Sequence, residues 1–412
     1  MVAINNMPVI PRGVWGLVHL LPPYNSKDFG ERQYTAKVLP LICLIVIMTW
    51  CATTQAAVLP QERSDAMYHS YQGGGMSIDG PSILLRKNIG NSVSVTANYY
   101  VDTISGASID VLATASQYQE ERTEHSVGLD YLRNKTLMNL SYTTSSENDF
   151  EATSISFGLS QDFFGDLTTL SIGYARGNDE VGKRGDDNFL EQADRQNYRL
   201  GLTQVVTKNM IVGLSFENIA DEGYLNNPYR SVRFIDESSA RGYRFETEAY
   251  PTTRTSNAAA LSANYYLPYR ASLYAEAKVF SDTWGIDANT YKVGYIHTFT
   301  DDWIIELRSR FYSQDKADFY QDLYQRSEEF NFRARDKEMS TFSNVALGFS
   351  VSYEFRFSAA NWLKKSSINL DFDHVRFAYD DFRNVLVDAP VGDEPLYEFS
   401  ANITRLYVSI FY

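Results

Sequence analysis

The feature that most constrains this chain is an alternation of apolar and polar side chains in segments of about ten residues. In the clearest segment, from Phe342, the apolar positions are Val345, Leu347, Phe349, Val351, Tyr353 and Phe355. The positions between them are Asn344, Ala346, Gly348, Ser350, Ser352, Glu354 and Arg356. An amphipathic helix would repeat every 3.6 residues, so a period of two indicates a strand with one apolar and one polar face.

Composition extends this interpretation to most of the chain. The sequence holds 29 Tyr and 24 Phe, spread singly among polar residues. Beyond about residue 60, the sequence offers no run apolar enough to cross a bilayer as a helix. Strands in a bilayer must pair every backbone group, which requires a closed ring. We therefore predict an all-β fold, a transmembrane antiparallel β-barrel.

About fifteen strands can be placed directly from the alternation. Their ranges are 79–88, 92–102, 124–132, 136–144, 150–162, 167–176, 195–206, 209–218, 254–267, 270–281, 288–299, 302–314, 341–357, 365–378 and 397–412. The connections alternate between short turns and loops such as 219–253 and 315–339. Bacterial barrels have short periplasmic turns and long external loops, and this rule demands one more, initial strand. Residues 65–72 fit it, which predicts a barrel of about 16 strands with both ends in the periplasm.

The N-terminal region has the order of a secretory signal. Arg32 and Lys37 precede the apolar run 39–50, and small residues follow. We predict a signal peptide at 31–57, a short periplasmic lead at 58–64 and the barrel at 65–412. Residues 1–30 fit no part of a signal and are interpreted as a mis-assigned N-terminal extension.

The chain ends on an aromatic residue with alternate apolar positions before it. These positions are Leu406, Val408, Ile410 and Tyr412, and they resemble the C-terminal signal read by the barrel-assembly machinery. Upstream, the apolar set shifts phase to Phe399, Ala401 and Ile403. A β-bulge between Ile403 and Leu406 would reconcile the two phases, and a similar change occurs between Phe372 and Val375.

Two stretches resemble a known family. The early hairpin 81–108, above all Val101–Ser108 (VDTISGAS), and the closing aromatic strand are similar to the proteobacterial family of domain of unknown function 3570. The resemblance would cover about Ala66 to Tyr412. It implies an outer-membrane barrel, often encoded beside a flavin transferase and a small lipoprotein, and hence a scaffold in an envelope redox system.

Charged residues on the polar faces predict the lining of the lumen, since charges facing lipid cost several kcal/mol near the midplane. The candidates are Glu276, Lys278, Glu306, Arg308, Arg310, Glu354 and Arg356. They would either select permeant ions or pack as a salt-bridge network.

No catalytic or metal site is predicted. Four of the five histidines (His69, His125, His297 and His374) follow the predicted signal peptide, lie on separate strands and are interpreted as isolated polar or interfacial residues. The neighbours of His374, Asp371 and Asp373, would share a face away from it. Acidic loop residues such as Asp179, Asp388 and Glu394 lack the ligand spacing of a calcium loop and are interpreted as a solvated surface.

These features favour a channel or translocation pore for small solutes or ions in a Gram-negative outer membrane, with no enzymatic activity and no cofactor. A scaffold for a periplasmic lipoprotein and a surface hydrolase are the alternatives. The expected partners are outer-membrane lipid and lipopolysaccharide, the barrel-assembly machinery and a periplasmic lipoprotein. Nucleic acid is excluded, because the net charge of −14 would repel its phosphates.

Overall fold

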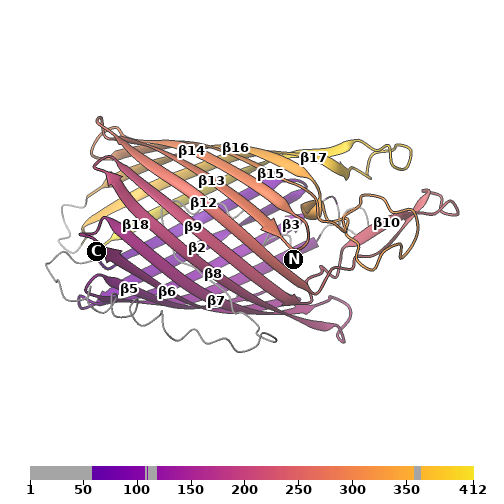
Figure 1. The fold of residues 1–412 in the computed structure, drawn as a ribbon, viewed down its shortest axis with the longest axis horizontal. Coiled ribbons are helices and arrows are strands. Elements are labelled where there is room, and N and C mark those ends of the chain that lie inside the picture. The colour runs from indigo at the N-terminus through magenta and orange to yellow at the C-terminus, as the bar shows by residue number, and fades with distance from the viewer. Residues whose placement is uncertain (1–57, 107–108, 110–117, 357–362) are drawn as a thin grey trace, which may run out of the picture.

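The computed structural model describes residues 58–106, 109, 118–356 and 363–412. The predicted extension 1–30 and the whole of the predicted signal peptide 31–57 lie outside the described residues. The described chain forms one closed antiparallel barrel of sixteen strands, together with a separate two-stranded hairpin (Figure 1).

The strands agree closely with the alternation in the sequence. In the first half of the barrel they are β1 (Arg63–Gly73), β2 (Met76–Ile89), β3 (Val93–Gly106), β4 (Tyr118–Arg133), β5 (Thr136–Ser146), β6 (Phe150–Phe163), β7 (Thr168–Gly182), β8 (Leu190–Thr207) and β9 (Met210–Gly223). In the second half they are β12 (Thr253–Leu267), β13 (Ala271–Asp282), β14 (Asp287–Thr298), β15 (Trp303–Gln314), β16 (Phe342–Phe355), β17 (Lys365–Arg383) and β18 (Leu396–Phe411). The hairpin consists of β10 (Ser231–Ile235) and β11 (Tyr243–Thr247) and was not predicted.

The ring closes between its first and last strands. β1 pairs with β18 from Arg63 opposite Phe411 to Gly73 opposite Ala401. The initial strand demanded by the turn rule is therefore confirmed, and so is the count of sixteen. β9 pairs directly with β12, which leaves the β10–β11 hairpin outside the ring.

The two ends of the barrel differ. At one end, here called the turn end, tight connections use residues with positive φ, such as Gly90 (65°) and Asn134 (56°). Longer segments leave the other end, the loop end, and extend beyond the ring (Figure 1). The start of β1 and the end of β18 lie together, because Arg63 pairs with Phe411. They lie at the turn end, because Arg63 also pairs with Arg86, which shortly precedes the turn at Gly90.

Side chains alternate between the inside and the outside of the ring. Ile305, Val351, Leu370 and Leu406 follow one another in register across β15 to β18, and all point outward. The polar positions between them point inward. None of the helical segments in the described part of the chain is long and apolar enough to cross a membrane.

The predicted bulge in β18 is wrong. Ile403 pairs with Asp373 and Leu406 pairs with Leu370 without any shift, and the β1 side is equally regular. The apolar set changes phase because apolar side chains near the loop end point inward, where they form a core with the members Val375, Phe377, Tyr379, Phe382, Ala401 and Ile403. The outward positions at that level are polar, for example Arg376 and Glu398, which form an exposed ion pair at 2.8 Å.

Candidate functional site: a charged lumen beneath a folded cap

Three predicted lumen residues on β15 point inward and join a network across the wall. Arg308 donates two hydrogen bonds of 2.8 Å to the carboxylate of Asp373 on β17. Arg405 on β18 donates a third to the same carboxylate at 3.1 Å. Arg310 donates to Asn344 at 3.2 Å, and Glu306 accepts from the hydroxyl of Tyr274. This cluster is a packed salt-bridge network, one of the two arrangements that the sequence left open.

A glycine makes room for this network. A Cβ atom on Gly348 of β16 would lie 2.0 Å from Oδ1 of Asp373 and 2.8 Å from Nε of Arg308. No side chain fits at these distances, so the glycine permits the bidentate pair to lie flat against the strand. The alternation in the sequence showed the face of Gly348 but not this requirement.

The other lumen candidates lie apart from this network. Lys278 on β13 faces Glu217 at 3.8 Å, and Glu276 lies half-buried on the same face. Glu354 accepts a 2.6 Å bond from Lys365 close to the turn end. Arg356 follows the last residue of β16 and is exposed, so the structure places it at the rim. The seven candidates therefore form separate groups and not one ring.

The outward residues of the final strand lie as predicted. Leu406 and Val408 are exposed on the outer face, and Ile410 continues the same row. The hydroxyl of Tyr412 donates a 3.0 Å bond to the backbone oxygen of Arg86. The structure thus gives these residues an exposed row and an anchored end, while their role in assembly stays a prediction.

Three of the four histidines in the described part of the chain lie on the outer face. His125 packs against Tyr99, His297 lies among aromatic residues near the turn end, and His374 contacts Asn402. Asp371 and Asp373 share the inner face, away from His374, as the alternation predicted. His69 is different: its side chain is buried, and Nε2 lies 2.7 Å from Asp102. This pair could not be recognised from local patterns, because the two residues are 33 positions apart.

The opposite wall of the lumen contains a cavity of about 250 Å³ near the loop end. Its charged lining comes from β4, β7, β8 and the turn after β5, and comprises Arg122, Glu124, Glu147, Asp179 and Arg195. Hydroxyl residues such as Thr143 and Ser154 line another part of it. Asp179 was interpreted in the sequence as part of an acidic external loop, whereas it lies within β7. The other four charged residues were not candidates, because they lie on separate strands and turns that the sequence does not bring together.

Glu147 is the most unusual residue of this cavity. Its side chain is only 5% exposed, its Oε1 lies 4.0 Å from Arg122, and Oε2 has no hydrogen-bond partner among the described residues. Burial, followed by the nearby charge of Glu120, raises the pKa of Glu147 to about 7. The ionised form is thus incompletely satisfied by the protein.

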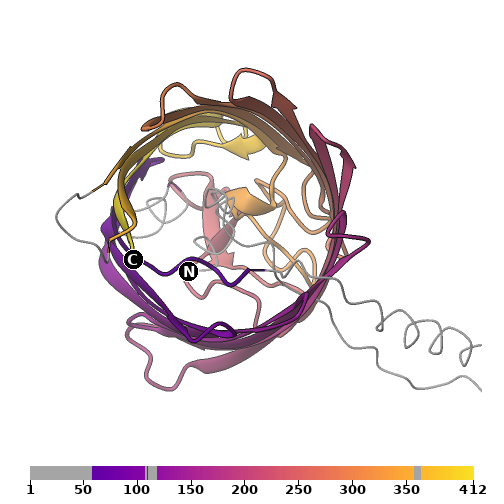
Figure 2. The ribbon, with the colours of Figure 1, turned by 90° about the vertical axis from the view of Figure 1, so that its left-hand side faces the viewer.

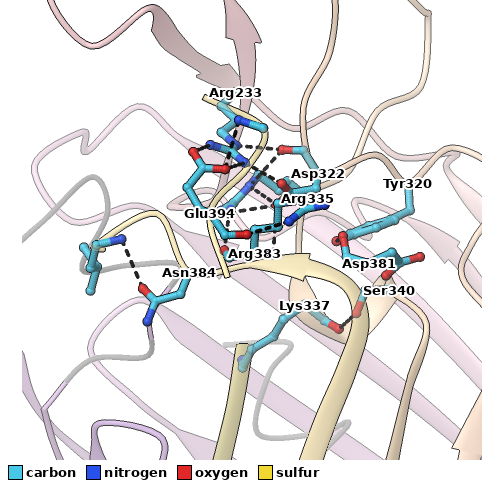
Figure 3. Close-up of polar contacts among 12 residues, drawn as sticks. Arg233, Tyr320, Asp322, Arg335, Lys337, Ser340, Asp381, Arg383, Asn384 and Glu394 are labelled. Atoms are coloured by element: carbon cyan, nitrogen blue, oxygen red, sulfur yellow. Dashed lines mark hydrogen bonds and ion pairs between the residues drawn. The ribbon is translucent and has the colours of Figure 1, made fainter. Parts of the chain in front are cut away.

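Segments at the loop end fold together into a compact unit, here called the cap, which comprises residues 224–252, 315–341 and 384–395. Its centre is Arg233 on β10, which is completely buried. Arg233 donates to Glu394 at 2.5 and 3.0 Å and also to Asp322, so that one side chain joins all three segments (Figure 3). Arg335 donates to Asp322 at 3.0 Å beside it.

The environment of Glu394 corrects its interpretation as a solvated loop residue. It is 3% exposed. Burial alone would raise its pKa, but the hydrogen bonds and the charge of Arg233 outweigh burial and hold the pKa of Glu394 below its ordinary value. No cluster of three or more His, Cys, Asp or Glu in the described part of the chain is arranged to bind a metal ion.

An apolar cluster fixes the cap to the barrel. Tyr250, Tyr320 and Met339 of the cap pack with Trp284 and Ile286 from the β13–β14 connection. Beside them, Glu248 accepts hydrogen bonds from the hydroxyl of Tyr250 at 2.7 Å and from a backbone amide at 2.6 Å. Burial, and then the charge of Asp336, raises the pKa of Glu248 to about 7.

The cap lies over the mouth of the barrel. In Figure 1 the β10 hairpin and neighbouring segments extend beyond the ring, and in Figure 2, along the axis, they fall within its outline. Tyr229 of the cap donates to Asp149 in the turn after β5, next to the cavity. The cavity and the cap thus meet at the loop end.

The sequence matches a family described as "Protein of unknown function (DUF3570)" over residues 110–374. The chain belongs to this family. The resemblance drawn from the early hairpin and the closing strand is confirmed, although both stretches lie outside the matched residues. A search of curated proteins found no match.

Several solved barrels are similar in fold. A bacterial polysaccharide outer membrane secretin has 6% identity and a TM-score of 0.44 over 85% of this chain and 99% of its own. The CymD monoaromatic hydrocarbon channel has 10% identity and a TM-score of 0.41 over 86% and 89%. The outer membrane protein opdK from Pseudomonas aeruginosa has 10% and 0.39 over 86% and 100%. The fold assignment itself rests on the strand pairing.

Proposed function

We propose that this protein is a channel of the Gram-negative outer membrane that admits small polar solutes or ions and has no enzymatic activity. The observation that carries the proposal is the closed ring of sixteen strands with an apolar outer face and a charged inner face. Such a ring satisfies every backbone group within lipid, and a ring of this size encloses a lumen wide enough for water. The loop end would face the exterior.

The side chains inside the barrel indicate which wall a solute would follow. The wall formed by β15 to β18 is occupied by the Arg308–Asp373 network and, above it, by the aromatic core around Phe377. The wall formed by β4 to β8 contains the cavity. Solutes would therefore pass along β4 to β8, beneath the cap, and the buried ion pairs of Arg233 would hold the resting mouth nearly closed.

Recording from the purified protein in planar bilayers tests this function. We expect small, infrequent openings in the wild type and more frequent openings in Arg233→Met, which loosens the cap. Arg244→Met is the matched control, because Arg244 lies on the same hairpin but its side chain is 60% exposed. A tight seal at all voltages for the wild type and for Arg233→Met would contradict the channel.

A further inference from the structure

The positive charges in the cavity on β4 to β8 are already engaged by protein carboxylates. Arg122 bonds to Glu124 at 2.9 Å and lies 3.8 Å from Asp102. Arg195 bonds to Asp221 at 2.6 Å. Each guanidinium thus has a carboxylate partner, so the positive charges of the cavity are already balanced within the protein.

The negative charges are less well satisfied. Glu147 lines the cavity, its side chain is 95% buried, and its Oε2 has no hydrogen-bond partner among the described residues. Asp179 lines the same cavity from β7. A buried carboxylate oxygen without a donor costs free energy, and a ligand that supplies N–H donors removes that cost.

We propose that this cavity binds the protonated amine of a small polar solute, with Glu147 and Asp179 as the groups that receive the ammonium. The inference rests on the proposed channel function and names its substrate class. A volume of about 250 Å³ suits a small organic molecule, since a water molecule occupies about 30 Å³. The hydroxyls of Thr143 and Ser154 are suited to the polar remainder of such a solute.

A divalent metal ion fits this cavity less well. Calcium takes six to eight oxygen ligands, whereas the described residues contain no group of three or more acidic or histidine side chains arranged around one point. An ammonium needs only two or three acceptors at hydrogen-bond distance. The two lining carboxylates Glu147 and Asp179 therefore suit an organic cation better than a metal ion.

Isothermal titration calorimetry on the full-length protein in detergent tests the proposal without requiring conduction. The probes are 1,4-diaminobutane, the uncharged 1,4-butanediol and the dianion succinate. We expect the diamine to bind at least about tenfold more tightly than the diol, and Glu147→Gln to weaken it at least about tenfold, the loss of one charge-assisted bond. Asp179→Asn should weaken it in the same direction. Glu354→Gln, the same change near the turn end, should leave binding unchanged.

The outcomes separate the inference from the function on which it rests. Diamine binding no stronger than diol binding, tighter binding of succinate, or full binding by both Glu147→Gln and Asp179→Asn would overturn the proposal. A conducting channel without diamine binding would overturn it and leave the channel intact. Diamine binding by a protein that never conducts would support the site and remove the channel. Because the pKa of Glu147 is about 7, binding should also weaken below pH 7.

Discussion

Replacing Arg233 with methionine should detach the three segments of the cap from one another. The guanidinium is fully buried and donates to both Glu394 and Asp322. Methionine retains the length and the apolar stem of the side chain, so the change removes mainly the charge and its hydrogen bonds. The barrel, whose strands pair without Arg233, should remain assembled.

The loss of cap stability in Arg233→Met can be estimated from the carboxylates that stay buried. Removing one member of a buried ion pair costs about 3 to 5 kcal/mol, because the partner stays buried without compensation. Asp322 keeps Arg335 at 3.0 Å, whereas Glu394 loses its cation. We therefore expect the lower end, about 3 kcal/mol, which increases the population of the open cap roughly a hundredfold. Arg244→Met removes a pair whose arginine is 60% exposed and should cost under about 1 kcal/mol.

Hydrogen exchange followed by mass spectrometry measures this opening directly. Backbone amides within 224–252 and 384–395 should exchange roughly a hundred times faster in Arg233→Met than in the wild type, while β13 peptides serve as the internal standard. If the cap of Arg233→Met exchanges no faster than that of Arg244→Met, the buried ion pairs do not hold the cap, and the reasoning is refuted.

Further predictions concern the lumen, the outer face and pH. Asp373→Asn should lower the free energy of unfolding by about 3 kcal/mol in denaturant titrations, since two arginines lose their carboxylate, and Asp371→Asn, with one contact at 3.8 Å, by under about 1 kcal/mol. Leu370→Arg on the outer apolar row should cost about 2 to 4 kcal/mol in lipid, and Asn402→Arg on the same face near the loop end about 0 to 1; equal losses would contradict the orientation in the membrane. Burial raises the pKa of Glu248 to about 7, so between about pH 4.5 and 7 the closed cap binds a proton that the open cap does not. The stability of the closed cap should therefore fall as pH rises through this range. Glu248→Gln should abolish this pH dependence of hydrogen exchange in the cap, once intrinsic exchange rates are corrected for pH.

The ring could be predicted from the sequence because its rules are local. Side chains in each strand alternate every two residues, and the alternation of short and long connections requires an even number of strands, which predicts β1. The apolar alternation wrongly predicted a β-bulge near Ile403 and a similar change near Val375, because that interpretation assumes that the outer face contacts lipid along the whole strand. Beyond the apolar belt the outer face contacts water, so apolar side chains are more stable when they point into the barrel. The apolar positions therefore move from one face of the strand to the other without a bulge.

The cap could not be predicted because its contacts join distant residues. Arg233 and Glu394 are 161 positions apart, and neither lies in a segment with a long regular repeat. The strands β10 and β11 have five residues each, too few for alternation to stand out. The only sequence signal was the concentration of arginine and aromatic residues in 229–250 and 319–335, which is unusual for a solvated loop.

The two walls of the lumen differ in the size of their inward side chains, and this difference decides where a solute can pass. The inward positions at the centre of β5 and β6 are small, such as Ser141, Thr143, Ser154 and Ser156, and leave open space. Those of β15 to β18 include arginines and aromatic rings that fill their side. Because a sixteen-stranded ring is too wide for side chains alone to close, the cap must complete the closure over the hydroxyl-lined wall. Opening of the cap would then directly expose the cavity beside Glu147, because the cap contacts the barrel there through Tyr229 and Asp149.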